Sequence, residues 1–321
     1  MLWRLLPAAI MFFAASMTSG AAATTGQKQP QPYLAKLSGP QRVIAAQICL
    51  ARQLLSPGSV DGLIGPKTRA ALKVFQQREN LPLTGEPDDV TLSRLLSDEP
   101  LFCNYVITTN DLARLRPATK TWLSKSLQDR LDYETIIELV GERCAANPNL
   151  IVRLNPDVNW TNVAPGLSLK VPKIDLPAVP PRAGFLRIYL GDRALEALDE
   201  STNVIAHFPC SIARQAEKRL GGELHVIKAA ENPSYTFDPE IFPESAEGRE
   251  LGRKLLIPPG PNNPVGTVWI GLDAPGYGIH GTPRPEEVGR AETHGCFRLA
   301  NWNAELLVKM VTIGTPVFIV P

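Results

Sequence analysis

The order of apolar and polar residues predicts helices in the first third of the chain. Apolar residues spaced four, three and four positions apart form one helix face, namely Ile44, Ile48, Ala51 and Leu55. A second helix is predicted to open at Gly65-Pro66-Lys67-Thr68, because proline is tolerated in a first helical turn. A third helix is predicted to begin near Asp88, a residue type that caps helix N-termini.

The pattern changes to strands after Gly184, where Leu186, Ile188 and Leu190 alternate with other residues. Further strands are predicted within 204–210, 223–229, 269–272 and 315–320. Asn301 or Asn303 is expected to cap a helix. The last part should therefore be a mostly β domain with one short helix. The proline-rich stretch 232–264 is expected to form a lid or a cleft wall, and a surface loop that contacts no ligand is the alternative.

Between these parts, residues 104–172 predict a short strand near Tyr105 and an amphipathic helix from Glu134 to Cys144. Segment 112–132 looks inserted. Residues 173–183 contain three prolines and predict a stiff linker. The expected organisation is a segment at 1–23, a linker at 24–39, a helical domain at 40–98, a middle module at 104–172, the linker at 173–183 and the strand-rich domain at 184–321.

The N-terminal segment has one positive charge, a short apolar run and small residues ending at Ala23, which is typical of a secretory signal peptide. An uncleaved membrane anchor is the alternative, although the run is broken by Pro7 and is short for a membrane span. The net charge of the 321 residues is +1, so no basic surface for nucleic acid is indicated.

Export would permit disulfides among the five cysteines. With Cys296 set aside, the other four allow three pairings, and the favoured bridge joins Cys49 to Cys103 because these residues bracket one small domain. Buried free thiols are the alternative. We therefore expect Cys49–Cys103 and leave the other pairings open.

The candidate chemistry lies between His280 and Arg298. Cysteine is nucleophilic only as the thiolate, so it needs a base or a positive neighbour. His280 and His294 precede Cys296 by sixteen and two residues, and a glycine follows each histidine. A zinc site of His280, His294 and Cys296 is the alternative reading, but no fourth ligand stands at a typical zinc spacing.

This stretch reads His280-Gly281-Thr282, a polar spacer, then Thr293-His294-Gly295-Cys296-Phe297-Arg298. It resembles the active-site signature of the L,D-transpeptidase (YkuD-type) catalytic domain. The resemblance implies that Cys296 is the nucleophile and His280 the proton donor and acceptor, with the Gly281 carbonyl orienting its ring. His294 would shape the cleft or raise the local positive potential, and the backbone N–H groups around Gly295 and Cys296 would face the oxyanion. Arg298, Thr293 and Tyr277 would bind substrate, and the alternative role of Arg298 is to hold the loop itself. The papain-like and NlpC-type peptidases place cysteine before histidine, unlike this chain.

Two further resemblances concern the upstream parts. Residues 40–98 resemble a three-helix peptidoglycan-binding domain, through Val60-Asp61-Gly62, Gly65-Pro66-Lys67-Thr68 and Leu83-Thr84-Gly85. Leu154-Asn155-Pro156 and residues 165–172 resemble the back half of a LysM module, a βααβ unit, whereas the front half departs from that pattern. The expected fold class is thus multidomain α+β.

Together these resemblances imply an exported enzyme of the periplasm or cell envelope that forms 3→3 peptidoglycan cross-links through a Cys296 acyl-enzyme, with release of D-Ala. They imply no cofactor, no metal and no nucleic acid. The expected partners are peptidoglycan stem peptides and glycan strands, possible acceptors include a wall-anchored lipoprotein, and carbapenems are expected covalent inhibitors. The alternatives are an L,D-carboxypeptidase, an enzyme that attaches or releases a lipoprotein, and a non-catalytic peptidoglycan-binding protein.

Overall fold

The computed structural model describes residues 37–117, 119–242, 245–289, 293 and 295–321. The predicted signal peptide and residues 24–36 of the predicted linker lie outside the described residues. Within the described part of the chain, no helix is both long enough and apolar enough to cross a membrane.

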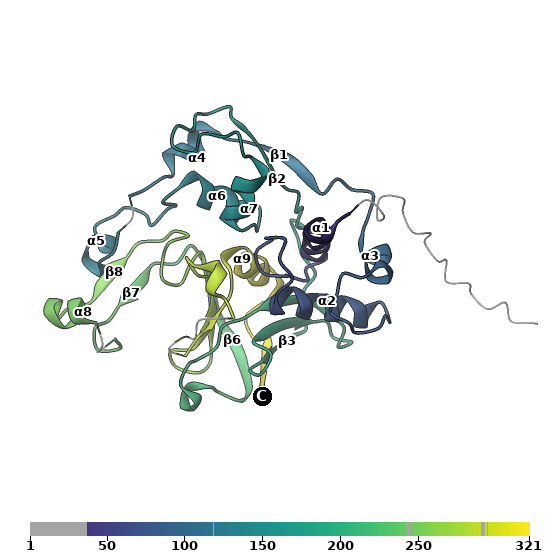
Figure 1. The fold of residues 1–321 in the computed structure, drawn as a ribbon. Coiled ribbons are helices and arrows are strands. Elements are labelled where there is room, and N and C mark those ends of the chain that lie inside the picture. Colours follow the sequence, from purple (N-terminus) through teal and green to yellow (C-terminus); the bar gives the residue numbers. More distant parts are fainter. Residues whose placement is uncertain (1–36, 118, 243–244, 290–292, 294) are drawn as a thin grey trace, which may run out of the picture.

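The N-terminal domain contains helices α1 (Gly39–Arg52), α2 (Pro66–Arg78) and α3 (Asp89–Leu95). Pro66 opens α2 and Asp88 caps α3 by accepting a hydrogen bond from the Thr91 amide, as the sequence predicts. The inward faces of the helices form one apolar core that includes Leu50, Leu72 and Leu92. This domain lies on the right in Figure 1.

The middle module lies at the top of Figure 1 and is built around an antiparallel pair of strands, β1 (Phe102–Val106) and β2 (Ser168–Pro172). Its helices are α4 (Thr109–Ala113), α5 (Trp122–Ser126), α6 (Ile136–Arg143) and α7 (Pro148–Leu154). Four helices, α4 to α7, lie between β1 and β2, whereas the βααβ unit of the resemblance has two, and α5 lies inside the segment that looked inserted. The assignment to LysM and its binding of glycan stay predictions.

The C-terminal domain is organised on an eight-stranded sheet of order β11-β10-β9-β6-β12-β3-β4-β5. Its strands are β3 (Phe185–Tyr189), β4 (Ala194–Leu198), β5 (Val204–Pro209), β6 (Gly222–Glu231), β9 (Val268–Leu272), β10 (Gly278–His280), β11 (Phe297–Arg298) and β12 (Pro316–Val320). Short 3-10 turns occupy Ala216–Lys218 and Pro285–Glu287. Pairs β10/β11 and β12/β3 are parallel, and the other neighbours are antiparallel.

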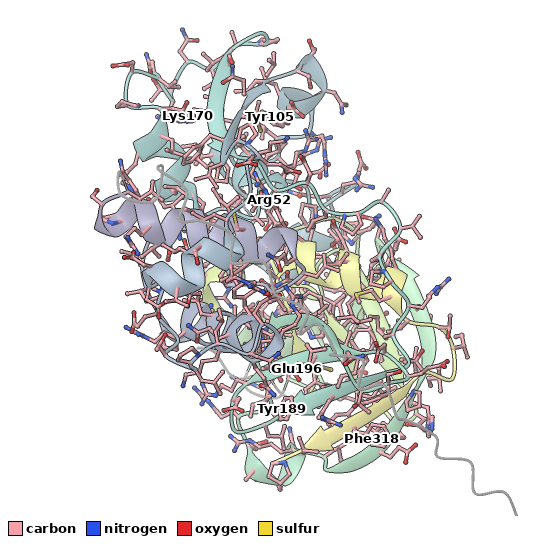
Figure 2. The ribbon with its side chains drawn as sticks, turned by 90° about the vertical axis from the view of Figure 1, so that its right-hand side faces the viewer. Arg52, Tyr105, Lys170, Tyr189, Glu196 and Phe318 are labelled. Carbon is pink, nitrogen blue, oxygen red and sulfur yellow. The ribbon has the colours of Figure 1, made fainter. Side chains whose placement is uncertain are left out.

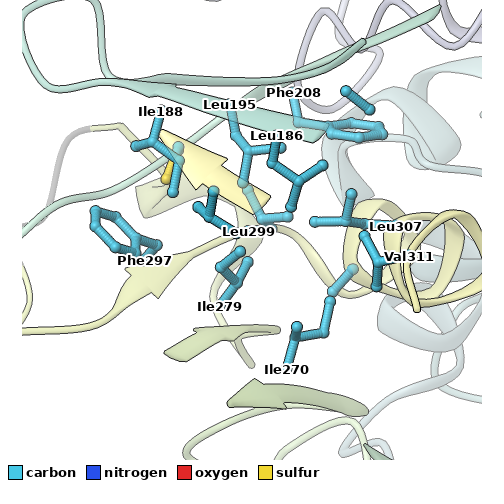
Figure 3. Packing of buried hydrophobic residues seen from close by; sticks show 14 of the residues in the cluster. Leu186, Ile188, Leu195, Phe208, Ile270, Ile279, Phe297, Leu299, Leu307 and Val311 are labelled. Carbon is cyan, nitrogen blue, oxygen red and sulfur yellow. The ribbon is translucent and has the colours of Figure 1, made fainter. Parts of the chain in front are cut away.

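Helix α9 (Asn301–Met310) packs on this sheet through apolar side chains. Figure 3 shows Leu307 and the following Val311 opposite strand residues such as Leu186 and Ile270. The expected cap of α9 is wrong: the N-cap is Ala300, and no side chain caps the helix. Asn301 is instead the first helical residue, and its buried side chain makes contacts elsewhere.

Segment 232–264 has more structure than a loop. Strands β7 (Tyr235–Phe237) and β8 (Leu255–Ile257) pair antiparallel, and α8 (Ala246–Leu251) lies between them. The expectation of one short helix in this domain is therefore wrong, because α8 and α9 are both present. Strand β4 was also not expected from the pattern, because all five of its residues are buried and no alternation marks it.

The upstream parts pack against the C-terminal domain. Leu55 and His207 form a backbone bridge, and the Asn303 side chain donates to the Ser56 hydroxyl. Arg52 donates to the Lys173 carbonyl in the predicted linker. Figure 2 shows Arg52 between the middle module, marked by Tyr105, and the large sheet, marked by Glu196. The chain segments are thus in mutual contact.

The expected Cys49–Cys103 disulfide is wrong, because all five cysteines are free thiols. Cys49 is buried in the core of the helical domain, whereas Cys103 is exposed on β1. Burial raises the pKa of the Cys49 thiol, which keeps it protonated and unreactive.

Candidate active site

A cavity of about 1060 Å³ contains most of the sequence-predicted site residues. The C-terminal domain contributes Cys296, His280 and Arg298 to its lining. The middle module contributes Trp122 and Lys125, from the segment that looked inserted. The cavity therefore has walls from two parts of the chain, and the sequence did not reveal the second wall.

Strand pairing explains why the reactive side chains share this cavity. Strands β10 and β11 run parallel, with Ile279 opposite Phe297 and His280 opposite Arg298. Ile279 and Phe297 point into the apolar core. Because side chains alternate along a strand, His280 and Arg298 point to the other face, and so does Cys296 directly before β11.

His280 is buried, and its Nδ1 lies 2.7 Å from the Gly281 carbonyl oxygen. A carbonyl can only accept, so Nδ1 carries the proton and Nε2 keeps a lone pair. The Trp269 ring stacks on the imidazole, with centroids 5.7 Å apart. Burial, helped by the positive charge of Arg298, lowers the His280 pKa to about 4. The ring is therefore neutral at pH 7 and able to take up a proton.

Cys296 is a protonated thiol in this arrangement, and its Sγ donates to the Gly276 carbonyl at 3.4 Å. Burial raises the pKa of the thiol, while a backbone hydrogen bond from Gly278 and the charge of Arg298 oppose that rise. A buried thiol with a raised pKa needs a base at the moment of attack. His280, in the same cavity, has the free lone pair that such a base requires.

Arg298 brings a buried positive charge to the cavity. Burial is the main cause that lowers its pKa, and the neighbouring charge of Arg284 adds to it. Among the described residues, the buried Arg298 Nε has no hydrogen-bond partner. A guanidinium with an unused donor favours a carboxylate or a developing oxyanion as ligand.

Thr293, Gly295 and Tyr277 also line the cavity, but their polar groups are engaged within the protein. The Thr293 hydroxyl donates to the Cys296 carbonyl and accepts from the Gly295 amide, so it ties the catalytic loop together. The Tyr277 hydroxyl donates to the Lys218 carbonyl at 3.1 Å. Their substrate-binding roles stay predictions. His294 lies outside the described residues.

Segment 232–264, which is expected to form a lid or cleft wall, packs against the middle module. Trp122 of α5 stacks on Phe237 with ring centroids 4.1 Å apart, and Tyr235 and Phe242 surround it. The backbone amides at the start of α5 donate to the Glu247 carboxylate on α8. Figure 1 shows α5 beside β8. We call these four rings, Trp122, Tyr235, Phe237 and Phe242, the aromatic clamp.

In the part of the chain that the structure describes, no group of three or more His, Cys, Asp or Glu side chains could hold a metal ion. The alternative zinc site would also include His294, which lies outside the described residues.

Two family models match the chain. Residues 184–319 match the L,D-transpeptidase catalytic domain, YkuD, and residues 39–95 match a model described as "Putative peptidoglycan binding domain". The chain therefore carries an L,D-transpeptidase catalytic domain of the YkuD type behind a peptidoglycan-binding domain. The predicted fold class, multidomain α+β with a helical N-terminal part and a mostly β catalytic domain, is confirmed.

Several curated relatives share the catalytic part. "Putative L,D-transpeptidase YqjB" of Bacillus subtilis is 39% identical over 104 residues, which are 30% of this chain and 49% of that protein. "Putative L,D-transpeptidase YkuD" of Bacillus licheniformis is 26% identical over 171 residues, 53% of this chain and 85% of that protein. This chain thus spans about half the length of YqjB.

Solved structures with similarity include the L,D-transpeptidase of Xylanimonas cellulosilytica, at 14% identity and a TM-score of 0.35, covering 87% of this chain and 92% of that one. An L,D-transpeptidase from Mycobacterium smegmatis has 17% identity and a TM-score of 0.33, covering 49% and 64%. Both TM-scores are below 0.5, so the description of the fold rests on the strand order of this chain.

Proposed function

We propose that this protein is a cysteine-dependent L,D-transpeptidase that forms 3→3 cross-links in peptidoglycan. The observation that carries the proposal is that Cys296 and a neutral His280 line one cavity beside the charge of Arg298. The Nδ1–H group of His280 is hydrogen-bonded to the Gly281 carbonyl, which leaves Nε2 free to act as the base. The matching catalytic domain supports the reaction class.

In the first half-reaction, His280 Nε2 takes the Cys296 proton while Sγ attacks the carbonyl that joins the L-centre of a diamino acid to D-Ala. The carbon–sulfur bond forms, and the carbon–nitrogen bond to D-Ala breaks. The proton on His280 passes to the leaving amine, so D-Ala departs with a neutral amino group and its carboxylate unchanged, and a thioester remains. Arg298 and the backbone amides near Gly295 stabilise the developing oxyanion.

In the second half-reaction, an amine on another stem peptide attacks the thioester and loses a proton to His280. The new amide forms as the carbon–sulfur bond breaks, and the proton returns to Cys296. Because resting His280 is neutral, it can accept the proton in both half-reactions. Water in place of the amine gives L,D-carboxypeptidase activity, and a protein lysine gives attachment of a lipoprotein.

Export to the cell envelope belongs to the same proposal. The peptidoglycan-binding domain and the catalytic domain both act on material outside the cytoplasmic membrane, which supports this location. Binding of the polymer by the N-terminal domain would raise the effective concentration of the enzyme at its substrate. A fusion of residues 1–23 to a reporter that is active only after export tests the signal, and an inactive reporter would contradict it.

The activity is tested by incubating purified protein with tetrapeptide muropeptides and separating products by mass spectrometry. Cross-linked dimer supports transpeptidation, whereas tripeptide alone means hydrolysis. Cys296→Ala should abolish both products and the mass adduct that a carbapenem forms. Cys103→Ala is the matched control, because it removes the exposed thiol on β1. Product formation by Cys296→Ala at the wild-type rate would refute the mechanism.

A further inference from the structure

We propose that Glu142, on helix α6 of the middle module, is a positioning residue of the active site. It acts through Asn301, which holds the peptide group whose carbonyl orients His280. The inference rests on the proposed role of His280 as the base. It makes the middle module part of the catalytic centre, in addition to any role in binding the wall.

The chain of contacts begins at the peptide group between Gly281 and Thr282. Its carbonyl oxygen accepts a hydrogen bond from the His280 Nδ1–H group, and its N–H donates to the Asn301 side-chain oxygen at 2.9 Å. Because a peptide group is planar, fixing its N–H also fixes the direction of its carbonyl. Asn301 therefore sets the orientation of the imidazole without touching it.

Two glycines let Asn301 reach this position. A Cβ atom at Gly281 would lie 2.2 Å from the Asn301 side-chain oxygen, and one at Gly266 would lie 2.0 Å from it. Gly266 also has a φ of +62°, which favours glycine. The same oxygen accepts a second hydrogen bond from the Thr267 amide at 3.3 Å. The fully buried Asn301 amide is thus enclosed by backbone that only glycine permits.

Glu142 fixes which way the Asn301 amide points. Asn301 Nδ2 donates to a Glu142 carboxyl oxygen at 3.1 Å and to the Pro261 carbonyl at 3.2 Å. A flipped amide would set its NH₂ group against two backbone N–H donors and its oxygen against two acceptors. Without Glu142, one acceptor is lost and a buried donor is left partly unsatisfied, so the preference for this orientation of the Asn301 amide weakens.

Docking of α6 on the catalytic domain brings Glu142 to Asn301. One turn earlier, Glu138 accepts from the Asn262 side chain at 2.8 Å. Residues four apart share one helix face, so both carboxylates point to the same side. Just beyond α6, Ala145 packs with Ala300 and Trp302 of the catalytic domain. The helix therefore presents two acids to two asparagines across the contact.

The test compares three variants of the full-length protein in the muropeptide assay. Glu142→Ala removes the acceptor and should lower kcat by about 10- to 100-fold, as loss of an outer positioning partner does, with little change in KM. Glu142→Gln retains an acceptor oxygen and should restore kcat to within about threefold of wild type. Asp157→Ala is the matched control, since it removes an exposed carboxylate from the same module.

A second readout separates positioning from mere stability. The nitrogen chemical shifts of the His280 ring report its tautomer, and the wild-type protein should show the Nδ1–H form. Glu142→Ala should show a mixture of tautomers at a temperature where thermal unfolding shows that the variant is folded. Glu142→Gln should show the wild-type form.

Full activity of Glu142→Ala, or lost activity with an unchanged tautomer and no rescue by glutamine, overturns the inference. These outcomes differ from failure of the proposed function, which would appear as products formed by Cys296→Ala or His280→Ala. A Glu142→Ala variant with low kcat, a mixed tautomer and glutamine rescue supports the positioning role.

Discussion

The acid limb of the pH profile should lie far below the ordinary range of histidine. His280 is buried beside Arg298, and both the burial and the charge disfavour the imidazolium, so its pKa is about 4. An unperturbed histidine titrates near 6.5. The base should therefore stay neutral and competent down to mildly acidic pH, and kcat/KM should fall only as pH drops through about 4.

The difference is large enough to measure. At pH 5.5, a base with a pKa near 4 is about 97% neutral, whereas one near 6.5 is about 9% neutral, a ratio of about tenfold in rate. Lowering the His280 pKa from 6.5 to about 4 also corresponds to about 3 kcal/mol of stability. Because the His280 pKa is lower in the native state, the native state binds fewer protons than the unfolded state. The stability that His280 contributes is therefore present above pH 6.5 and is lost as pH falls toward 4.

The assay follows acylation of Cys296 by a chromogenic β-lactam from pH 3.5 to 8 at constant ionic strength. Arg298→Gln removes a charge that lowers the His280 pKa, so the acid limb should move to higher pH. His225→Gln is the control, since that exposed histidine contacts Asp273 and Glu223 and is assigned no catalytic role. An acid limb near pH 6.5 in the wild-type protein would refute the assigned burial of His280.

Three further substitutions test the surroundings of the site. Burial beside Glu305 raises the pKa of Glu142, so the stability that Glu142 contributes is full below about pH 4.3 and is lost as pH rises through the raised pKa. The thermal unfolding midpoint of the wild-type protein should therefore fall between pH 4 and 8, and Glu142→Gln should make this fall smaller. Trp122→Ala removes the stack in the aromatic clamp, worth about 0.5–1.5 kcal/mol beyond its buried area, and should raise KM and speed hydrogen exchange in β7 and β8; unchanged exchange would contradict the clamp. Gly281→Ala places a Cβ 2.2 Å from the Asn301 oxygen and should abolish activity, whereas Gly221→Ala, with open space around it, should be active.

Local patterns in the sequence predicted much of the fold. The spacing of Ile44 and its neighbours, Pro66 in a first turn and Asp88 as a cap are all short-range signals, and helices α1 to α3 follow them. Alternation likewise predicted β3 and β12. Strand β4 was not predicted, because both of its faces are covered and its sequence therefore shows no alternation of apolar and polar residues.

The candidate site was predictable as far as its motif is continuous. His280 ends β10 and Cys296 directly precedes β11, and their shared cavity follows from the pairing of these two strands. Trp122 gave no such signal. Its partner Phe237 is more than a hundred residues away, and a tryptophan in a polar segment without helical or strand periodicity is interpreted as part of an insertion.

Asn301 shows why the remaining contacts could not be inferred. An asparagine at the start of a helix is ordinarily a cap, because its side chain can accept from nearby amides. Here the acceptors and donors around it come from three distant segments: the peptide group after Gly281, the segment with the Pro261 carbonyl and the Thr267 amide, and Glu142, whose carboxyl group is 159 residues away. Such a site exists only after the middle module has docked on the catalytic domain. Because the orientation of the base then depends on that docking, a substitution at the contact should alter catalysis while leaving every residue of the active-site motif in place.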